Sequence, residues 1–250
     1  MTYIWQRDKW PHLKWKNDAL IELLGKARLA QGKLLSKVSD LGMGLSKESR
    51  AEILTEETIK TSAIEGHKLE EEAVRSSVAR RLGLPTGGVT RQDRNAEGMI
   101  DVIMDATANY KKPLTAERLK SWQAALFPTG YSGLRKIHAG AWRGPEPMQV
   151  ISGPVGREKV HFEAPPSQRI EEEMDAFLQW WRQGHGEMDG LLRAAVAHFY
   201  FVTIHPFEDG NGRIARAITD MALAQDESLE KRYYSLSSRI MKDRSSYYDI

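Results

Sequence analysis

Two apolar helical segments that meet at a short loop constrain the fold of this chain most strongly. The first runs from Leu191 to Ile204, and Pro206 ends it because proline has no backbone N–H to continue a helix. The second starts near Gly212 and runs to about Ala224. We therefore expect two consecutive helices, with residues 205–211 forming the turn between them.

Helical spacing also dominates most of the remaining sequence. Apolar residues recur three or four positions apart, and glycine or proline interrupts the segments. Thr115 and Ser167 are expected N-caps, and Gly66 follows a helix where a left-handed residue is favoured. Further helices are predicted at 18–38, 47–65, 70–82, 93–110, 115–127, 167–183 and from 237 onward.

One region has the pattern of strands rather than helices. Residues 148–153 and 159–162 are two short β-prone runs around a turn that contains glycine and proline. The fold class is therefore predicted as mainly α, with one small β-hairpin. Trp5, Trp10 and Trp15 recur every five residues, and we expect them to dock an irregular N-terminal arm onto the body of the protein.

The composition excludes several kinds of site. The chain has 250 residues without cysteine, so disulfides, thiolate metal sites and a cysteine nucleophile are excluded. Its 36 basic and 34 acidic residues nearly balance, which gives no general support for nucleic-acid binding. The N-terminus is charged and no stretch reaches the roughly 18 apolar residues of a membrane span. We expect a soluble, cytoplasmic protein that contacts no membrane.

The loop and the start of the second helix carry the groups that phosphate chemistry requires. Asp209 is a hard carboxylate ligand suited to Mg²⁺, and His205 is a candidate proton acceptor. Glycines at the start of a helix let backbone N–H groups converge on an anion, which the helix dipole also attracts. Arg213 and Arg216 lie three residues apart on that helix, so both can face the same phosphates. Together these residues predict phosphoryl or nucleotidyl transfer.

Each of these pieces has an ordinary structural explanation when it is taken alone. A histidine at a helix end is commonly a cap, and Gly-Asn-Gly is commonly a turn. A calcium loop is excluded, because an EF-hand needs glycine at its sixth position and Ile214 stands there. The joint occurrence of all the pieces favours the functional interpretation.

Residues 205–216 match in full the signature of the Fic family, His-x-Phe-x-Asp/Glu-Gly-Asn-Gly-Arg-x-x-Arg. The chain also resembles this family in its N-terminal arm and in its hairpin, whose counterpart is the target-docking flap. The flap residues are Val150, Ile151, Ser152 and Gly153. The resemblance implies a helical Fic (fido) core and an enzyme that transfers AMP from ATP to a Ser, Thr or Tyr hydroxyl of a target protein.

The resemblance also implies a role for each position of the signature. His205 would be the catalytic general base, and Asp209 would hold Mg²⁺. Arg213 would steady the leaving pyrophosphate and Arg216 the γ-phosphate. Phe207 would anchor the loop. The remaining nucleotide-binding positions would be Gly210, Asn211 and Gly212, with Asn211 on the α-phosphate, and the tyrosine pair Tyr247 and Tyr248.

A second motif of the family stands at the end of an earlier predicted helix. Thr61 to Gly66 match the inhibitory pattern Ser/Thr-x-x-x-Glu-Gly/Asn. Thr61 and Glu65 are four residues apart and share a helix face. By this resemblance Glu65 would pair with Arg216 and occupy the place that the γ-phosphate needs, so the enzyme would inhibit itself.

The predicted division of the chain follows from these motifs. Residues 1–45 would form an N-terminal helical extension, 46–110 the helices with the inhibitory motif, and 111–250 the catalytic core with its flap at about 143–163. Self-modification and a homodimer remain open.

Several alternatives also remain open: transfer of UMP or another group, removal of AMP with Glu65 orienting a water, and a non-catalytic nucleotide-dependent module. A nucleic-acid binder is disfavoured, because the local basic cluster is explained by a solvated face. That cluster comprises Arg75, Arg80, Arg81, Arg91 and Arg94.

Overall fold

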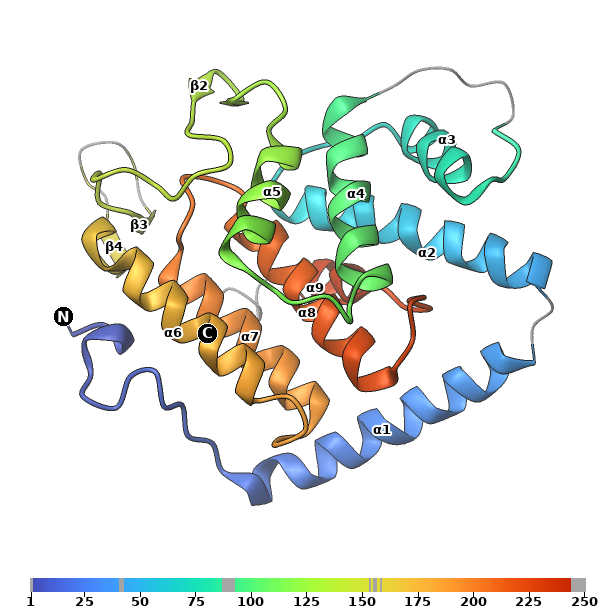
Figure 1. Ribbon diagram of the computed structural model, residues 1–250, viewed down its shortest axis with the longest axis horizontal. Coiled ribbons are helices and arrows are strands. Elements are labelled where there is room, and N and C mark those ends of the chain that lie inside the picture. The colour runs from blue at the N-terminus through green and yellow to red at the C-terminus, as the bar shows by residue number, and fades with distance from the viewer. Residues whose placement is uncertain are drawn as a thin grey trace.

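The computed structural model describes residues 2–40, 43–86, 93–152, 154, 157 and 159–243. The described part is mainly helical, with two small antiparallel hairpins (Figure 1), which confirms the predicted fold class. The helices are α1 (Asn17–Ser39), α2 (Met43–Ile64), α3 (Glu71–Leu82), α4 (Arg94–Ala108), α5 (Ala116–Leu126), α6 (Ile170–Gln183), α7 (Gly190–Ile204), α8 (Asn211–Glu227) and α9 (Leu236–Lys242). The strands are β1 (Tyr131–Ser132), β2 (Arg135–Lys136), β3 (Gln149–Ser152) and β4 (Lys159–Glu163).

Helix α8 is the centre of the core. Every residue from Arg213 to Ala224 is buried, as expected of a helix that other elements surround on all sides. Helices α7, α4, α5 and α2 pack around it, and Figure 1 shows α8 in the middle of the molecule. Because α8 is held on every side, its N-terminus is a fixed point on which a site can be built.

The predicted turn between α7 and α8 is present and tightly closed. His205 follows α7 in a left-handed conformation, with φ of 52°, and Gly210 precedes α8 with φ of 90°. The side chain of Asn211 closes the loop, because it accepts from the N–H of Phe207 at 3.0 Å and donates to the carbonyl of Phe207 at 2.8 Å. Phe207 is fully buried against Trp142, so this loop is anchored in the core.

The predicted helix ends are partly confirmed. The Thr115 hydroxyl caps α5 by accepting from the N–H of Arg118 at 3.2 Å, and Gly66 is left-handed with φ of 81°. The prediction for Ser167 is wrong. Residues Ser167–Arg169 form a 3₁₀ turn, in which the N–H of Arg169 bonds to the carbonyl of Pro166, and α6 begins only at Ile170.

A second hairpin, β1–β2, was not predicted. Each of its strands has only two residues, which is too short to show an alternation of apolar and polar positions. The predicted hairpin is formed by β3 and β4, which pair antiparallel with a register shift between Val150 and Ile151.

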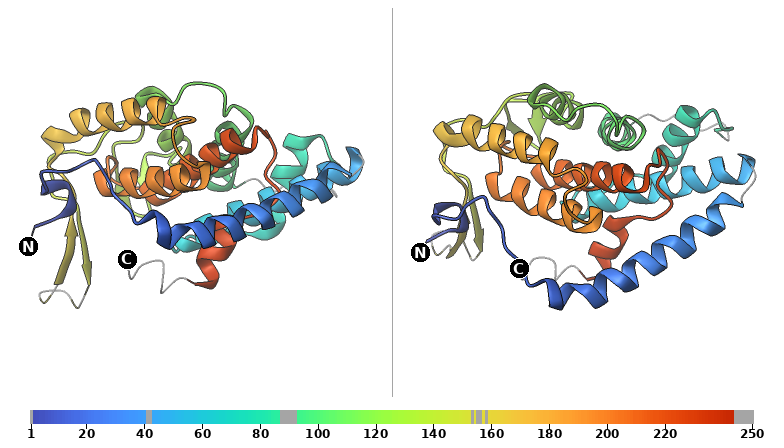
Figure 2. Two further views of the ribbon diagram at one scale, coloured as in Figure 1. Left: turned by 90° about the horizontal axis from the view of Figure 1, so that it is seen from below. Right: turned by 60° about the horizontal axis from the view of Figure 1, so that its bottom comes forward.

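The N-terminal arm docks through two of its three tryptophans. Trp5 donates its ring N–H to the carbonyl of Glu163, the last residue of β4, at 2.6 Å. Figure 2 shows the N-terminal segment beside the β3–β4 hairpin. Trp10 donates to Glu173 at 2.8 Å and packs edge-on against Tyr200. Trp15 is 38% exposed, whereas Trp5 and Trp10 are half-buried, so Trp15 is the least covered of the three.

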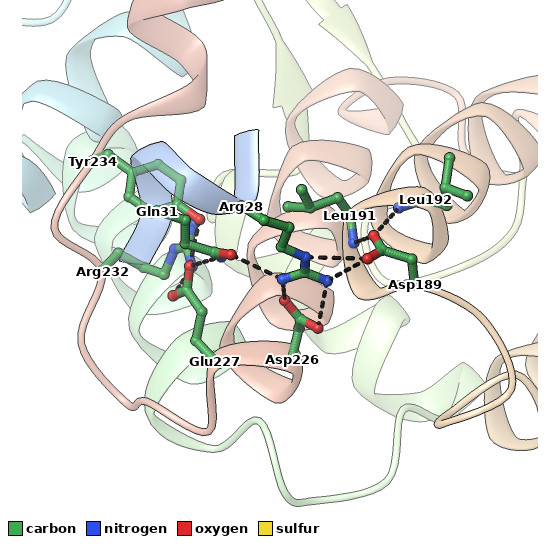
Figure 3. A network of polar contacts seen from close by, with 9 residues as sticks. All are labelled: Arg28, Gln31, Asp189, Leu191, Leu192, Asp226, Glu227, Arg232 and Tyr234. Carbon is green, nitrogen blue, oxygen red and sulfur yellow. Dashed lines mark hydrogen bonds and ion pairs between the residues drawn. The ribbon is translucent and has the colours of Figure 1, made fainter. Parts of the chain in front are cut away.

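Helix α1 lies on the outside and is fastened by polar contacts, since none of its residues is fully buried. Arg28 Nη2 bonds to Asp189, the N-cap of α7, at 2.9 Å and to Asp226, near the end of α8, at 3.0 Å (Figure 3). Gln31 bonds to Glu227 at 2.6 Å. Among the described residues, no helix combines the length and the apolar character that a bilayer crossing would need.

Candidate active site

The turn after α7 presents His205 with one defined ring tautomer. Its Nδ1 lies 3.2 Å from the backbone carbonyl of Val202. A carbonyl oxygen only accepts, so Nδ1 carries the proton and Nε2 of the neutral ring is free to accept one. Burial lowers the pKa of His205, which favours the neutral imidazole at pH 7. The geometry and the charge state both suit a general base.

The N-terminus of α8 supplies backbone N–H groups that the helix itself cannot pair. Gly212 lies in its first turn, and a Cβ at this position would collide with the carboxylate of Glu65. Glycine at this position lets an anionic group approach the helix end closely. In this structure that anionic group is the side chain of Glu65.

Thr61 in the last turn of α2 and Glu65, the residue directly after α2, both contact Arg216. Arg216 Nη2 donates to Glu65 Oε1 at 2.8 Å and to the carbonyl of Thr61 at 2.9 Å, while its Nε donates to the Thr61 hydroxyl at 2.7 Å. Arg216 is only 3% exposed. The contact expected between Glu65 and Arg216 is therefore present, and Thr61 fixes the plane of the guanidinium.

Arg213 is a buried cation with unused donors. In the part of the chain that the structure describes, its Nε and Nη2 have no hydrogen-bond partner, and Nη2 lies 3.6 Å from Asp209 Oδ1. Burial lowers the pKa of Arg213. Buried donors on a charged group are costly unless they are paired, so this geometry calls for an anionic ligand.

The two adjacent carboxylates of the loop point in different directions. Asp209 accepts from the N–H of Gly210 at 2.5 Å and from the hydroxyl of Ser132, and it stays on the side of Arg213. Glu208 turns away and contacts His138 Nδ1 at 2.5 Å. Asp209 is therefore the carboxylate that faces the site.

A metal ion would need ligands beyond these carboxylates. No group of three or more His, Asp or Glu side chains able to hold a metal occurs among the described residues. Mg²⁺ usually binds through one or two carboxylates together with substrate phosphates and water. Asp209 beside an anion site fits that mode.

Two residues near the site were missed by the sequence analysis. Arg143 Nε donates to the carbonyl of His205 at 2.9 Å, and Ser132 contacts Asp209. Ser132 belongs to the two-residue strand β1, and Arg143 lies in the connection between β2 and β3, so no local periodicity marks either residue.

The remaining predicted positions lie apart from this cluster or outside the described residues. Val150 and Ile151 are 49% and 53% exposed on the hairpin, where they are available to another molecule. The side chain of Ser152 and all of Gly153, Tyr247 and Tyr248 fall outside the described residues.

Comparisons with known proteins match two parts of the chain to known families. The Fic/DOC family matches residues 113–223, and a domain of unknown function, DUF4172, matches residues 3–84. The protein adenylyltransferase Fic of Nematostella vectensis is 38% identical over 60 residues, or 24% of this chain and 14% of that protein. A uridine 5'-monophosphate transferase of Xanthomonas campestris pv. campestris (strain 8004) is 37% identical over 67 residues, or 24% of this chain and 12% of that protein.

The likeness to solved structures extends over more of the chain. The crystal structure of a Fic family protein from Desulfovibrio desulfuricans G20 aligns with a TM-score of 0.67 at 19% identity, over 96% of this chain and 67% of that one. This likeness shows the fold. The sequence matches described above span 14% or less of the curated relatives.

Proposed function

We propose that this chain, whose residues 113–223 match the Fic/DOC family, transfers AMP from ATP to a hydroxyl side chain of another protein. We further propose that Glu65 keeps the enzyme inactive at rest. The observation that carries the proposal is the pair of buried donors on Arg213, beside the N-terminus of α8, that have no hydrogen-bond partner. A polyphosphate satisfies such donors, and a neutral apolar ligand does not.

The proposed reaction has one proton to move. The target's Ser, Thr or Tyr hydroxyl oxygen attacks the α-phosphorus, the bond to the β-phosphate oxygen breaks, and pyrophosphate leaves. His205 Nε2 takes the hydroxyl proton, for which its free lone pair and lowered pKa suit it. Mg²⁺ held by Asp209 and the phosphates would supply charge neutralisation at the phosphates.

The proposed inhibition is a competition for Arg216 and for the end of α8. The Glu65 carboxylate bonds to Arg216 and lies against Gly212, where a phosphate would otherwise bind. ATP must displace this carboxylate or bind in a pose in which the α-phosphorus does not face the attacking hydroxyl. The protein therefore needs a change at α2 before it transfers AMP at full rate.

A second candidate is transfer of UMP. The relative from Xanthomonas campestris is named a uridine 5'-monophosphate transferase, and the groups described around the phosphates do not select a base. Removal of AMP from a modified protein, with Glu65 orienting a water, is a third reaction that the same residues could perform.

The test uses E65G and the matched double variant E65G/H205A. Each protein is incubated with Mg²⁺ and with ATP, GTP, CTP or UTP separately, and its intact mass is measured, with and without cell lysate. We expect E65G to add an AMP mass with ATP only, and the double variant to add none. An addition of UMP would replace the AMP assignment. Equal modification of E65G/H205A would remove His205 from the mechanism.

A further inference from the structure

Arg143 is a buried arginine that bonds to the backbone around the catalytic histidine. It is 5% exposed and lies between β2 and β3. Its Nε donates to the carbonyl of His205 at 2.9 Å, and its backbone N–H donates to the carbonyl of Pro206 at 2.8 Å. Its Nη2 donates to the carbonyl of Pro165, just beyond β4. One residue in the segment before β3 thus joins the segment after β4 to the turn that carries His205.

We infer that Arg143 is a positioning residue for the proposed transfer reaction: it holds the turn at His205 and couples that turn to the β3–β4 hairpin. This inference rests on the proposed function of His205 as the general base. His205 has a left-handed backbone, which is unfavourable for a residue with a Cβ and persists only when its surroundings fix it. The hydrogen bonds from Arg143 to the two successive carbonyls at 205 and 206 supply that restraint.

The choice of arginine follows from the geometry of the contact. A planar guanidinium presents donors in a fixed fork, so it can reach the His205 and Pro165 carbonyls at once. Buried arginines usually pair with a carboxylate, and this one bonds to neutral carbonyls. Burial lowers the pKa of Arg143. The neutral carbonyls compensate the positive charge of Arg143 only weakly, so this charge acts on the nearby imidazole of His205.

The charges around His205 oppose one another. Burial is the main cause that lowers the pKa of His205, and Arg143 lowers it further, whereas Glu65 after α2 and Asp209 in the loop raise it. A positive neighbour disfavours the imidazolium form, so Arg143 helps to keep His205 able to accept a proton. This electrostatic effect gives the positioning role a signature that a purely structural arginine would lack.

The experiment compares Arg143 with Arg193, a second buried arginine. Arg193 is 4% exposed, donates to the carbonyl of Trp181 at 3.0 Å, and has its pKa lowered to about 10 by burial. We propose R143M, R143K and the matched control R193M. The pKa of the His205 imidazole is measured by NMR in the resting protein, with H205A used to assign the signal. The pH profile of AMP transfer is measured for each variant in the E65G background.

We expect R143M to raise the His205 pKa, to move the acid limb of the rate profile to higher pH and to lower the maximal rate roughly 10- to 100-fold. R143K keeps a positive charge without the planar fork, so it should retain the low pKa and lose rate. R193M should change stability alone.

An unchanged His205 pKa in folded R143M, or the same rise in R193M, would overturn the inference. If R143M does not fold, full activity in R143K would overturn it. The NMR measurement needs no catalysis, so failure of the proposed transferase activity leaves this test intact.

Discussion

At the scale of single residues, Glu208 and Asp209 are adjacent carboxylates with different surroundings. Glu208 is held by His138, and its side chain is 11% exposed. Asp209 accepts from the N–H of Gly210 and from Ser132, and its side chain is 35% exposed. The chemistry assigned to the loop therefore depends on the direction of each side chain. These two carboxylates are adjacent in sequence but point in different directions.

We predict that D209A loses Mg²⁺-dependent ATP binding and that E208A retains it. Asp209 is the carboxylate on the side of Arg213, whereas Glu208 contacts His138. ATP is titrated calorimetrically into each variant in the E65G background, once with Mg²⁺ and once with EDTA. E208A serves as the matched control. Equal loss of Mg²⁺-dependent affinity in both variants would show that the ligand assignment is wrong.

The residues of this site differ in how far the sequence could predict them. His205, Asp209 and Arg213 lie within one short segment, so their spacing in the sequence was enough to predict that they lie close together. Arg143 and Ser132 reach the loop from 62 and 77 residues away in the chain. Their contacts depend on how the connections between helices pack, and a single sequence carries no periodic signal for that.

At the scale of elements, α2 presents residues on successive turns of one face to the centre of the protein. Thr61 and Glu65 contact Arg216 on α8. One turn earlier, Glu57 accepts from the hydroxyl of Ser235 at 2.6 Å and from the N–H of Ser237 at 3.2 Å, at the start of α9. Helix α2 is thereby fixed to α8 and α9 together. The sequence predicted Glu65 on a helix, and the contact with Ser237 emerged only from the packing.

We predict that E65G increases AMP transfer, seen most directly as self-modification. Loss of the carboxylate frees Arg216 for a phosphate, because it removes the pair at 2.8 Å. A shift from 1:99 to an even population requires about 2.7 kcal/mol, which corresponds to a gain of about 50-fold. The gain is measured as the initial rate of mass addition with ATP and Mg²⁺.

Two variants serve as controls for this gain. E65Q keeps the shape of the side chain and loses its charge, so it should give part of the increase. R216A should give none, because it removes the phosphate ligand together with the partner of Glu65. If folded E65G bound ATP and transferred AMP no faster than the wild type, autoinhibition by Glu65 would be wrong, and the transferase assignment would stand.

Asp220, one turn after Arg216 on α8, gives a prediction about pH. It is 3% exposed, and burial together with the charge of Glu57 raises its pKa, even though Arg232 lies 3.5 Å away. An acid whose pKa is raised on folding binds its proton more tightly in the folded state. Its contribution to the free energy of unfolding is therefore fully present below the pKa of the unfolded state, about 3.9. This contribution declines as pH rises through the pKa of the folded state.

We expect D220N to flatten the pH dependence of the free energy of unfolding across that window. The amide mimics the protonated acid and has no charge to bury at high pH. Urea unfolding is followed at several pH values from 5 to 8.5, with D101N as the control, because the side chain of Asp101 is 57% exposed. A slope in D220N as steep as that of the wild type would mean that Asp220 is ionised throughout.

At the scale of the whole molecule, polar contacts fasten α1 and the N-terminal arm across the helical body. Arg28 joins the start of α7 to the end of α8 (Figure 3), and Trp5 joins the arm to the hairpin. Most helix positions of the body were predictable from apolar periodicity. The path of α1 was not, because its anchoring residues are charged and distant in sequence.

We predict that R28A loosens α1 without unfolding the body. Loss of the bonds to Asp189 and Asp226 should cost about 1–2 kcal/mol of local stability, since hydrogen bonds to charged groups contribute about that much. Hydrogen exchange of the α1 amides should then be roughly 5- to 30-fold faster. K26A removes the exposed pair with Glu22 on the same helix and should leave exchange nearly unchanged. Equal acceleration in both variants would show that Arg28 is not the anchor.

The order in which the chain is synthesised gives the contact between Glu65 and Arg216 a further meaning. The two residues are 151 positions apart, with Glu65 nearer the N-terminus. At about 5–20 residues per second, the ribosome adds Glu65 roughly 8–30 s before Arg216. Helix α2 has thus left the ribosome, with time to form, before the segment that it covers has been translated. Under the proposed inhibition, a newly made molecule therefore carries its inhibitory carboxylate from the moment that the segment bearing Arg216 can fold.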